Sequence, residues 1–195
     1  RTTAEFTNVR VQARFVKGGK FKVGTTEYQA TDGQFRMIQS QGKGPIVLGE
    51  GVSVKRLVIQ FEGMKSITPG PNLEGWKRLD RATIPEEKRP KWTVKNGIIE
   101  AVGGPGAIEY PTLYGNAVIQ VEGRSRNRHA NGGLFFRSIP GDFMNGYEVQ
   151  IHSACEKGDP SHPAEYATGG IDDRQNARRL VSRDFEPFVL TILAD

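Results

Sequence analysis

Short apolar runs separated by glycine and proline turns recur along this sequence, and they restrict the fold to β-sheet. In residues 1–70 the runs are Phe6–Phe15, Lys20–Val23, Phe35–Ile38, Ile46–Leu48 and Val54–Phe61. Turn residues such as Gly18-Gly19 and Asp32-Gly33 lie between them. No long segment in this part spaces its apolar residues at helical intervals. We therefore predict that the first part of the chain is β.

The rigid turn Pro69-Gly70-Pro71 is the best candidate for a boundary, because proline restricts the backbone. Residues 1–70 are a β-rich segment, either part of the same sandwich or the end of a preceding β domain, and residues 71–195 are the main domain. Asn96-Gly97 between alternating residues predicts a hairpin with a type I′ turn. Other elements predicted here are strands at Val118–Val121 and Phe185–Ala194, a helical turn at Ile84–Glu87 and a short helix within Asp172–Arg183.

Composition is that of an ordinary globular protein, with 36% hydrophobic and 25% charged residues in 195. The 24 glycines and 11 prolines suit many tight turns. Nothing approaches the roughly 20 consecutive apolar residues of a membrane span. The chain begins at Arg1 rather than Met and stops just after a core-type strand. We expect that a leader or an upstream region has been removed, or that the sequence is a fragment, and that the C-terminus is truncated.

The net charge of +5 is scattered, with no run of five or six basic residues. The densest cluster is Arg124, Arg126, Arg128 and His129, which we interpret as a solvated loop. Binding of a polyanion stays open as a third reading of the function, and no nucleic acid partner is expected. The single cysteine, Cys155, excludes an internal disulfide and a thiolate-rich zinc site, and we predict that it is a small buried residue.

The stretch Asn131–Ile151 carries the main functional candidates. Two strand-like runs, Leu134–Arg137 and Tyr147–Ile151, are joined there by a turn-rich connector. Alternation places Tyr147, Val149 and Ile151 on one face, and Glu148, Gln150 and His152 on the other. Neighbours on that second face lie about 6–7 Å apart, so an acid or base, an amide and an imidazole fall within one sugar's width. The alternative is a polar sheet face that simply meets water.

The loop after His152 offers a second histidine, His162, close to Asp159. If this loop folds back, His162, His152 and Glu148 would make a site for a divalent metal ion with an open position. The alternative is an exposed loop histidine.

Four further residues complete the candidate site. Arg137 can clamp a carboxylate or pair with Glu148 across the sheet. Asn131 is a turn residue whose amide can reach a ligand. Tyr147 and Tyr166 are candidates for stacking on a sugar ring, whereas Trp92 is assigned to the core. No nucleophile elbow, phosphate-binding loop or dinucleotide fingerprint is present.

Several short motifs occur in a specific order. They are G-W at Gly75-Trp76, W-x-V-x-x-G-x-I at Trp92–Ile99, N-G-G-L-F-F-R at Asn131–Arg137, G-Y-E-V-Q-I-H at Gly146–His152 and T-G-G-I at Thr168–Ile171. Together they resemble the 3-keto-disaccharide hydrolase family over about residues 72–195. The resemblance implies an all-β, concanavalin-like (laminin-G-like) jelly-roll sandwich in a secreted or periplasmic bacterial protein.

The resemblance also implies an activity and site residues. Members act on glycosides oxidised at C3, where the ketone acidifies the C2 proton and permits elimination of the aglycone followed by hydration. A divalent metal assists in some relatives. Glu148, Gln150 and His152 occupy the family's Y-E-x-Q-I-x-D/H strand, and Arg137 ends its F-R strand. Glu148 or a metal-bound hydroxide would abstract the proton, His152 would be a metal ligand or the acid for the leaving oxygen, and Arg137 would stabilise the enolate.

This chain also departs from the family's pattern. It has Asn131-Gly132-Gly133 for Asn-Ser-Gly and Thr168-Gly169-Gly170 for Thr-Gly-Ala. The strands that normally follow the F-V-L-T-I-L-A-D segment are missing, while Ala4–Val11 resembles a closing strand of such a domain. The rival reading of the whole is a non-catalytic carbohydrate-binding or adhesion module on the same sandwich.

Overall fold

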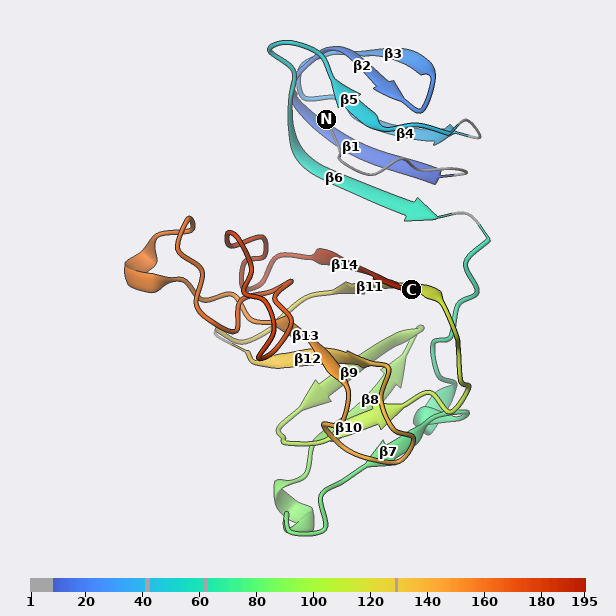
Figure 1. Cartoon of the computed structure of the whole chain (residues 1–195), viewed down its shortest axis with the longest axis vertical. Helices are drawn as coiled ribbons and strands as arrows, with labels where there is room; N and C mark the ends of the chain where they lie inside the picture. The colour runs from blue at the N-terminus through green and yellow to red at the C-terminus, as the bar shows by residue number, and fades with distance from the viewer. Residues whose placement is uncertain (1–8, 41–42, 62, 129) are drawn as a thin grey trace. The chain divides into compact units, whose positions relative to one another are not determined.

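The computed structural model describes residues 9–40, 43–61, 63–128 and 130–195, and within these ranges the chain is all-β (Figure 1). Its helical elements there are three turns of 3-10 helix, η1 (Pro71–Leu73), η2 (Glu86–Lys88) and η3 (Glu156–Gly158). The predicted all-β fold with antiparallel sheets is confirmed, and it is consistent with a β-sandwich. The chain divides into two compact units after Ser66.

Six strands lie in the described part of the first unit. They are β1 (Val9–Lys17), β2 (Gly19–Val23), β3 (Thr26–Ala30), β4 (Phe35–Ser40), β5 (Ile46–Leu48) and β6 (Ser53–Phe61). Two antiparallel sheets result, in the orders β4-β1-β6 and β3-β2-β5. The sequence predicted five of these strands, although residues 6–8 of the first predicted run lie outside the described residues. It missed β3, because T-E-Y-Q-A holds one large apolar residue and gives no alternating pattern.

Strand β1 is central because its alternation is the most regular in the chain. Val9, Val11 and Ala13 are buried in the core, while Arg10 and Arg14 are exposed on the opposite face. Burying each valine contributes about 1.5–3 kcal/mol. The core is completed by Phe15, also of β1, and by buried apolar residues of the other strands, namely Phe21, Val23, Ala30, Ile38 and Ile46.

The described residues of the second unit form eight strands in antiparallel pairs. They are β7 (Lys77–Leu79), β8 (Lys91–Lys95), β9 (Ile98–Val102), β10 (Ala107–Glu109), β11 (Ala117–Gly123), β12 (Gly132–Phe136), β13 (Tyr147–Ile151) and β14 (Phe188–Ala194). The pairs are β7 with β10, β8 with β9, β11 with β14, and β12 with β13. Val149, Leu190 and Ile192 form a core between the last two pairs. This core fixes which face of β13 remains for polar side chains.

Local predictions in the second unit are confirmed in part. Asn96 and Gly97 both have positive φ, +51° and +72°, as a type I′ turn requires. The strand predicted at Phe185–Ala194 is present as β14. It is not buried throughout, because buried and exposed residues alternate from Leu190 to Ala194. The helix predicted within Asp172–Arg183 is wrong, because Ile171 and Gln175 pair across a turn instead. Cys155 is free, as predicted, but half-buried rather than buried.

Two further predictions concern the surface. In the described part of the arginine-rich turn, Arg126 Nη2 lies 2.6 Å from Glu100 Oε1. No helix within the described ranges is both long enough and apolar enough to cross a membrane.

Candidate functional site

A polar face in the second unit is built around β13, which has an extended neighbour on each side. On one side β12 pairs with it, setting Phe135 opposite Glu148 and Gly133 opposite Gln150. On the other side the segment 168–172 runs antiparallel to it. Gln150 N donates to Gly170 O at 2.9 Å, and Asp172 N donates to Glu148 O at 2.9 Å. Three adjacent segments therefore contribute side chains to one surface.

The T-G-G-I motif explains how segment 168–172 can run along β13. Gly169 has a φ of +90°, and its N–H, rather than that of Gly170, donates to Gln150 O at 3.0 Å. This conformation suits glycine, and the register on either side of it, Glu148 with Asp172 and His152 with Thr168, is unchanged. Thr168 then uses its Oγ1 atom to accept from His152 N at 2.9 Å. The T-G-G-I motif, which the sequence analysis used only as a sign of the family, thus holds the open edge of β13 through hydrogen bonds.

A chain of hydroxyl groups holds the end of this ladder. Ser182 Oγ donates to Thr168 Oγ1 at 2.6 Å, and Thr168 Oγ1 donates to His152 O at 3.1 Å. Because the Ser182 proton is used there, Ser153 is the donor in its 2.9 Å contact with Ser182. The backbone of His152 is therefore fixed from the side of its neighbouring segment.

Glu148 is the most chemically distinctive residue of this face. Its side chain lies over Gly133, where an added Cβ would be 2.5 Å from Glu148 Cγ and 2.7 Å from Cδ. Partial burial first, and then the negative charge of Asp172, raise the pKa of Glu148, while a hydrogen bond with Gln150 lowers it. The net direction is upward, so the carboxylate of Glu148 binds a proton more tightly than an exposed glutamate does.

Gln150 lies beside Glu148, as the alternation predicts, but it is only 4% exposed. Its amide hydrogen-bonds to Glu148. Its Oε1 atom is buried and has no hydrogen-bond partner. A buried carbonyl oxygen without a donor costs about 1–3 kcal/mol, so its presence at this position requires an explanation.

Asp172 is the residue that sequence reasoning missed. The prediction placed it at the start of a helix, whereas the structure places it directly across from Glu148. A usable signal was present in the sequence, because T-G-G-I-D aligned antiparallel to Y-E-V-Q-I-H sets the two acids opposite each other. The register of such a pairing is set by tertiary contacts, so composition alone could not select it.

The other predicted residues are less closely assembled. His152 is half-buried with both ring nitrogens buried, one residue beyond β13. Arg137 has a φ of +54° and donates from Nη2 to Asn116 Oδ1 at 3.2 Å, so it does not pair with Glu148. Asn131 is exposed immediately before β12.

The two candidate stacking tyrosines are both exposed, and Tyr147 lies on the other face of β13. Tyr147 is 46% exposed and stacks on Phe136 with ring centroids 5.5 Å apart. Tyr147 points to the same face of β13 as Val149, so alternation places it on the face opposite to that of Glu148. Tyr166 is 45% exposed in the loop that precedes Thr168.

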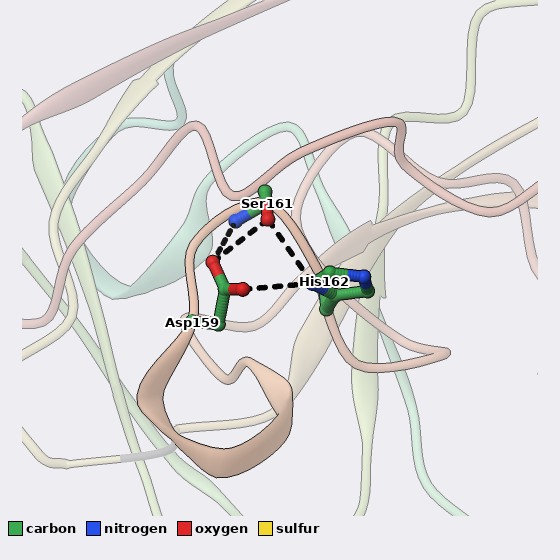
Figure 2. Close-up of polar contacts among 3 residues, drawn as sticks. All are labelled: Asp159, Ser161 and His162. Atoms are coloured by element: carbon green, nitrogen blue, oxygen red, sulfur yellow. Dashed lines mark hydrogen bonds and ion pairs between the residues drawn. The ribbon is translucent and has the colours of Figure 1, made fainter.

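His162 is bound within its own loop, as Figure 2 shows. Its Nδ1 atom lies 2.9 Å from Asp159 Oδ2 and 3.0 Å from Ser161 Oγ. The hydrogen bonds from Ser161, first from its backbone, and the contact with His162 lower the pKa of Asp159 to about 2. This trio is not a nucleophilic triad, because the serine and the aspartate both meet the same ring nitrogen. It is a local structure of an exposed loop.

The residues predicted for a metal site do not come together. Among the described residues, no group of three or more His, Cys, Asp and Glu side chains is placed to hold a metal ion. Glu148, His152 and His162 therefore do not form the expected three-ligand set.

Comparison with known proteins identifies the family. Residues 63–187 match the 3-keto-alpha-glucoside-1,2-lyase-like domain. This match covers well over half of the chain and includes β7 to β13 together with segment 168–172. The chain belongs to this family, as the motif order predicts. No curated protein and no solved structure matches the chain.

Proposed function

We propose that the second unit removes the aglycone from 3-keto-glycosides, with Glu148 as the base. Support comes from the family, whose name describes lyase chemistry on 3-keto-glucosides, and from one local observation. Glu148 is a half-buried carboxylate with a raised pKa, lying over Gly133 and facing Asp172. A carboxylate with increased proton affinity is suited to removing a carbon-bound proton.

The proposed reaction has two balanced steps. Glu148 takes the C2 proton, the C2–H electron pair forms a C1=C2 double bond, and the C1–O bond breaks. The leaving oxygen keeps that bond's electron pair and receives a proton, which releases the aglycone as an alcohol. Water then adds across C1=C2, with hydroxyl at C1 and the proton at C2, to give the free 3-keto sugar.

The neighbours of Glu148 have separate proposed roles. Asp172 keeps the proton affinity of Glu148 high through its negative charge. Gln150 orients the Glu148 carboxylate and presents its unpartnered Oε1 atom to a sugar hydroxyl. His152 is the proposed acid for the leaving oxygen. Arg137 is the proposed group that stabilises the enolate. For this role it must break its hydrogen bond with Asn116 when the substrate binds.

Release of 4-nitrophenol from 4-nitrophenyl 3-keto-α-glucoside by the full chain tests this function. We expect turnover, and we expect Glu148→Gln to lower kcat/KM by about 10²-fold or more. Glu87→Gln, which removes an exposed glutamate in η2, is the matched control and should retain full activity. No release by the unaltered chain, with or without added divalent metal, would refute the proposal. A chelator arm decides whether a metal takes part.

A non-catalytic carbohydrate-binding module is the second candidate. The observation favouring it is that Tyr147 and Tyr166 expose nearly half of their surface, as sugar-stacking rings require. Binding without turnover, weakened by Tyr147→Ala but not by Glu148→Gln, would select it. In either case we propose a secreted or periplasmic location, which fractionation of the native cell would test.

A further inference from the structure

The first unit, which lies almost entirely outside the family match, presents a cationic cavity on its own sheet. Because Val9, Val11 and Ala13 of β1 face the core, the alternate residues Arg10, Gln12 and Arg14 face away from it. The register sets Arg14 between Phe35 of β4 and Arg56 of β6. Two guanidinium groups and one aromatic ring thus form a row across three strands.

A register shift adds a third cation to this row. Arg14 pairs with Arg56, but the next residue, Phe15, pairs with Val54. Lys55 is therefore the extra residue of a β-bulge, and it is exposed. Like charges on directly opposed strand positions repel each other. Arg14, Arg56 and Lys55 therefore gather positive charge on this part of the sheet.

The row borders a cavity of about 120 Å³ lined by five residues, Gln12, Arg14, Phe35, Arg56 and Val58. We call it the arginine cavity. Val58 is 8% exposed and Phe35 is 53% exposed, so the cavity has an apolar floor and an open aromatic wall. None of the five lining residues is acidic. The cavity is thus large enough to hold several water molecules, or a small acidic group in their place.

The lining chemistry defines the ligand. Arginine binds carboxylate and sulfate through two parallel N–H donors, which a pair of arginines can offer from both sides. The ring of Phe35 suits the apolar face of a pyranose, and Gln12 adds an amide for a hydroxyl. Proteins that bind single-stranded nucleic acid use successive aromatic rings along a basic groove, whereas one ring lines this cavity.

We propose that the arginine cavity binds one acidic sugar residue of a polysaccharide, with Arg14 and Arg56 on its anionic substituent and Phe35 against its ring. The anion is a carboxylate, as in a uronic acid, or a sulfate. The second unit belongs to a family named for chemistry on a sugar, which makes a sugar the consistent ligand class. The proposal does not depend on turnover by the second unit.

Calorimetry with the full chain and defined oligosaccharides at low salt tests the proposal. We expect an oligogalacturonate to bind and its fully methyl-esterified form, which lacks the charge, not to bind. Arg14→Gln should weaken binding at least tenfold. Arg14→Lys should weaken it several-fold, because the charge stays but the paired donors are lost. Phe35→Ala should also weaken it several-fold. A sulfated oligosaccharide that binds more tightly with the same dependence on Arg14 identifies the anion as sulfate.

The matched control is the double variant Lys91→Gln, Lys95→Gln, which removes two exposed charges from β8 and should bind normally. Equal losses in this control and in Arg14→Gln, Arg56→Gln would show that only net charge matters and would overturn the proposal. Binding of the methyl ester as strong as that of the acid, or a single-stranded DNA oligonucleotide binding more tightly than either glycan, would also overturn it. Arg14→Gln should leave aglycone release unchanged, and Glu148→Gln should leave glycan binding unchanged, so the two proposals can fail separately.

Discussion

Replacing Gly133 by alanine tests whether the position of Glu148 determines activity. The added Cβ would lie 2.5 Å from Glu148 Cγ and 2.7 Å from Cδ, whereas ordinary contacts begin near 3.4 Å. Glu148 Cγ must therefore retreat by about 0.9 Å, the difference between 3.4 and 2.5 Å, and the Oε1 atom lies closer still to the added Cβ. Its neighbour Gly132 provides the control, because a Cβ added there meets nothing within 4 Å.

The two substitutions should separate stability from activity. The atoms that clash in Gly133→Ala belong to a flexible side chain, so its displacement is inexpensive and alanine gains about 0.5–1 kcal/mol over glycine in a strand. The free energy of unfolding should stay within about 1 kcal/mol of the parent. A displacement of about 1 Å at a catalytic group, in contrast, can lower the rate about 10²-fold.

The assay compares kcat/KM on 4-nitrophenyl 3-keto-α-glucoside with thermal unfolding for the parent, Gly132→Ala and Gly133→Ala. We expect a loss of about 10²-fold in Gly133→Ala and less than threefold in Gly132→Ala. In the background of Glu148→Gln, Gly133→Ala should cause little further loss. Parental activity in Gly133→Ala, or equal losses in both alanine variants, would refute the reasoning that Gly133 makes room for the catalytic carboxyl.

Four further predictions concern Glu148, Asp172, Tyr147 and His162. Its raised pKa means that the folded state holds the proton more tightly, so stability falls as pH rises from the ordinary glutamate range through the raised pKa. Asp172→Asn should lower that pKa and move the acidic limb of the kcat/KM profile to lower pH, and an unmoved limb would exclude the charge effect. Tyr147→Ala should cost about 0.5–1.5 kcal/mol of stability from its stacking on Phe136 but change kcat/KM less than threefold, and a large activity loss would place the ring in the site. His162→Ala should leave turnover and its response to chelator unchanged, whereas a loss of either would mean that its loop reaches the substrate.

The sequence predicted those parts of the fold that alternation alone determines. Strand β13 was predicted with its observed bounds, and the turn at Asn96-Gly97 followed from backbone sterics. Strand β3 was missed because its pairing with β2, not its own pattern, makes it a strand. The helix expected after Ile171 fails because pairing with β13 commits that segment to an extended path and a turn.

For the site, too, the sequence predicted what local alternation determines and missed what tertiary contacts determine. Alternation placed Glu148 and Gln150 side by side, and they are hydrogen-bonded. Predicting Asp172 required knowing how its segment pairs with β13, about 20 residues earlier in the chain. No local sequence pattern contains that register. Arg137 leaves the regular alternation through its positive φ, and its partner Asn116 comes from a different strand connection.

Gln150 connects the stability of this face to its proposed chemistry. Side chains on the solvent face of an ordinary antiparallel sheet are hydrated, but Gln150 is 4% exposed and its Oε1 atom has no partner. Folding alone would favour an apolar residue there, because the unpaired carbonyl costs free energy that a hydrocarbon would not. A sugar hydroxyl that donates to this atom recovers that cost only in the complex, where the same amide group holds Glu148 through its other end. Substrate binding and the position of the base would thus both depend on the Gln150 side chain. Gln150→Leu should therefore stabilise the free protein but raise KM and lower kcat.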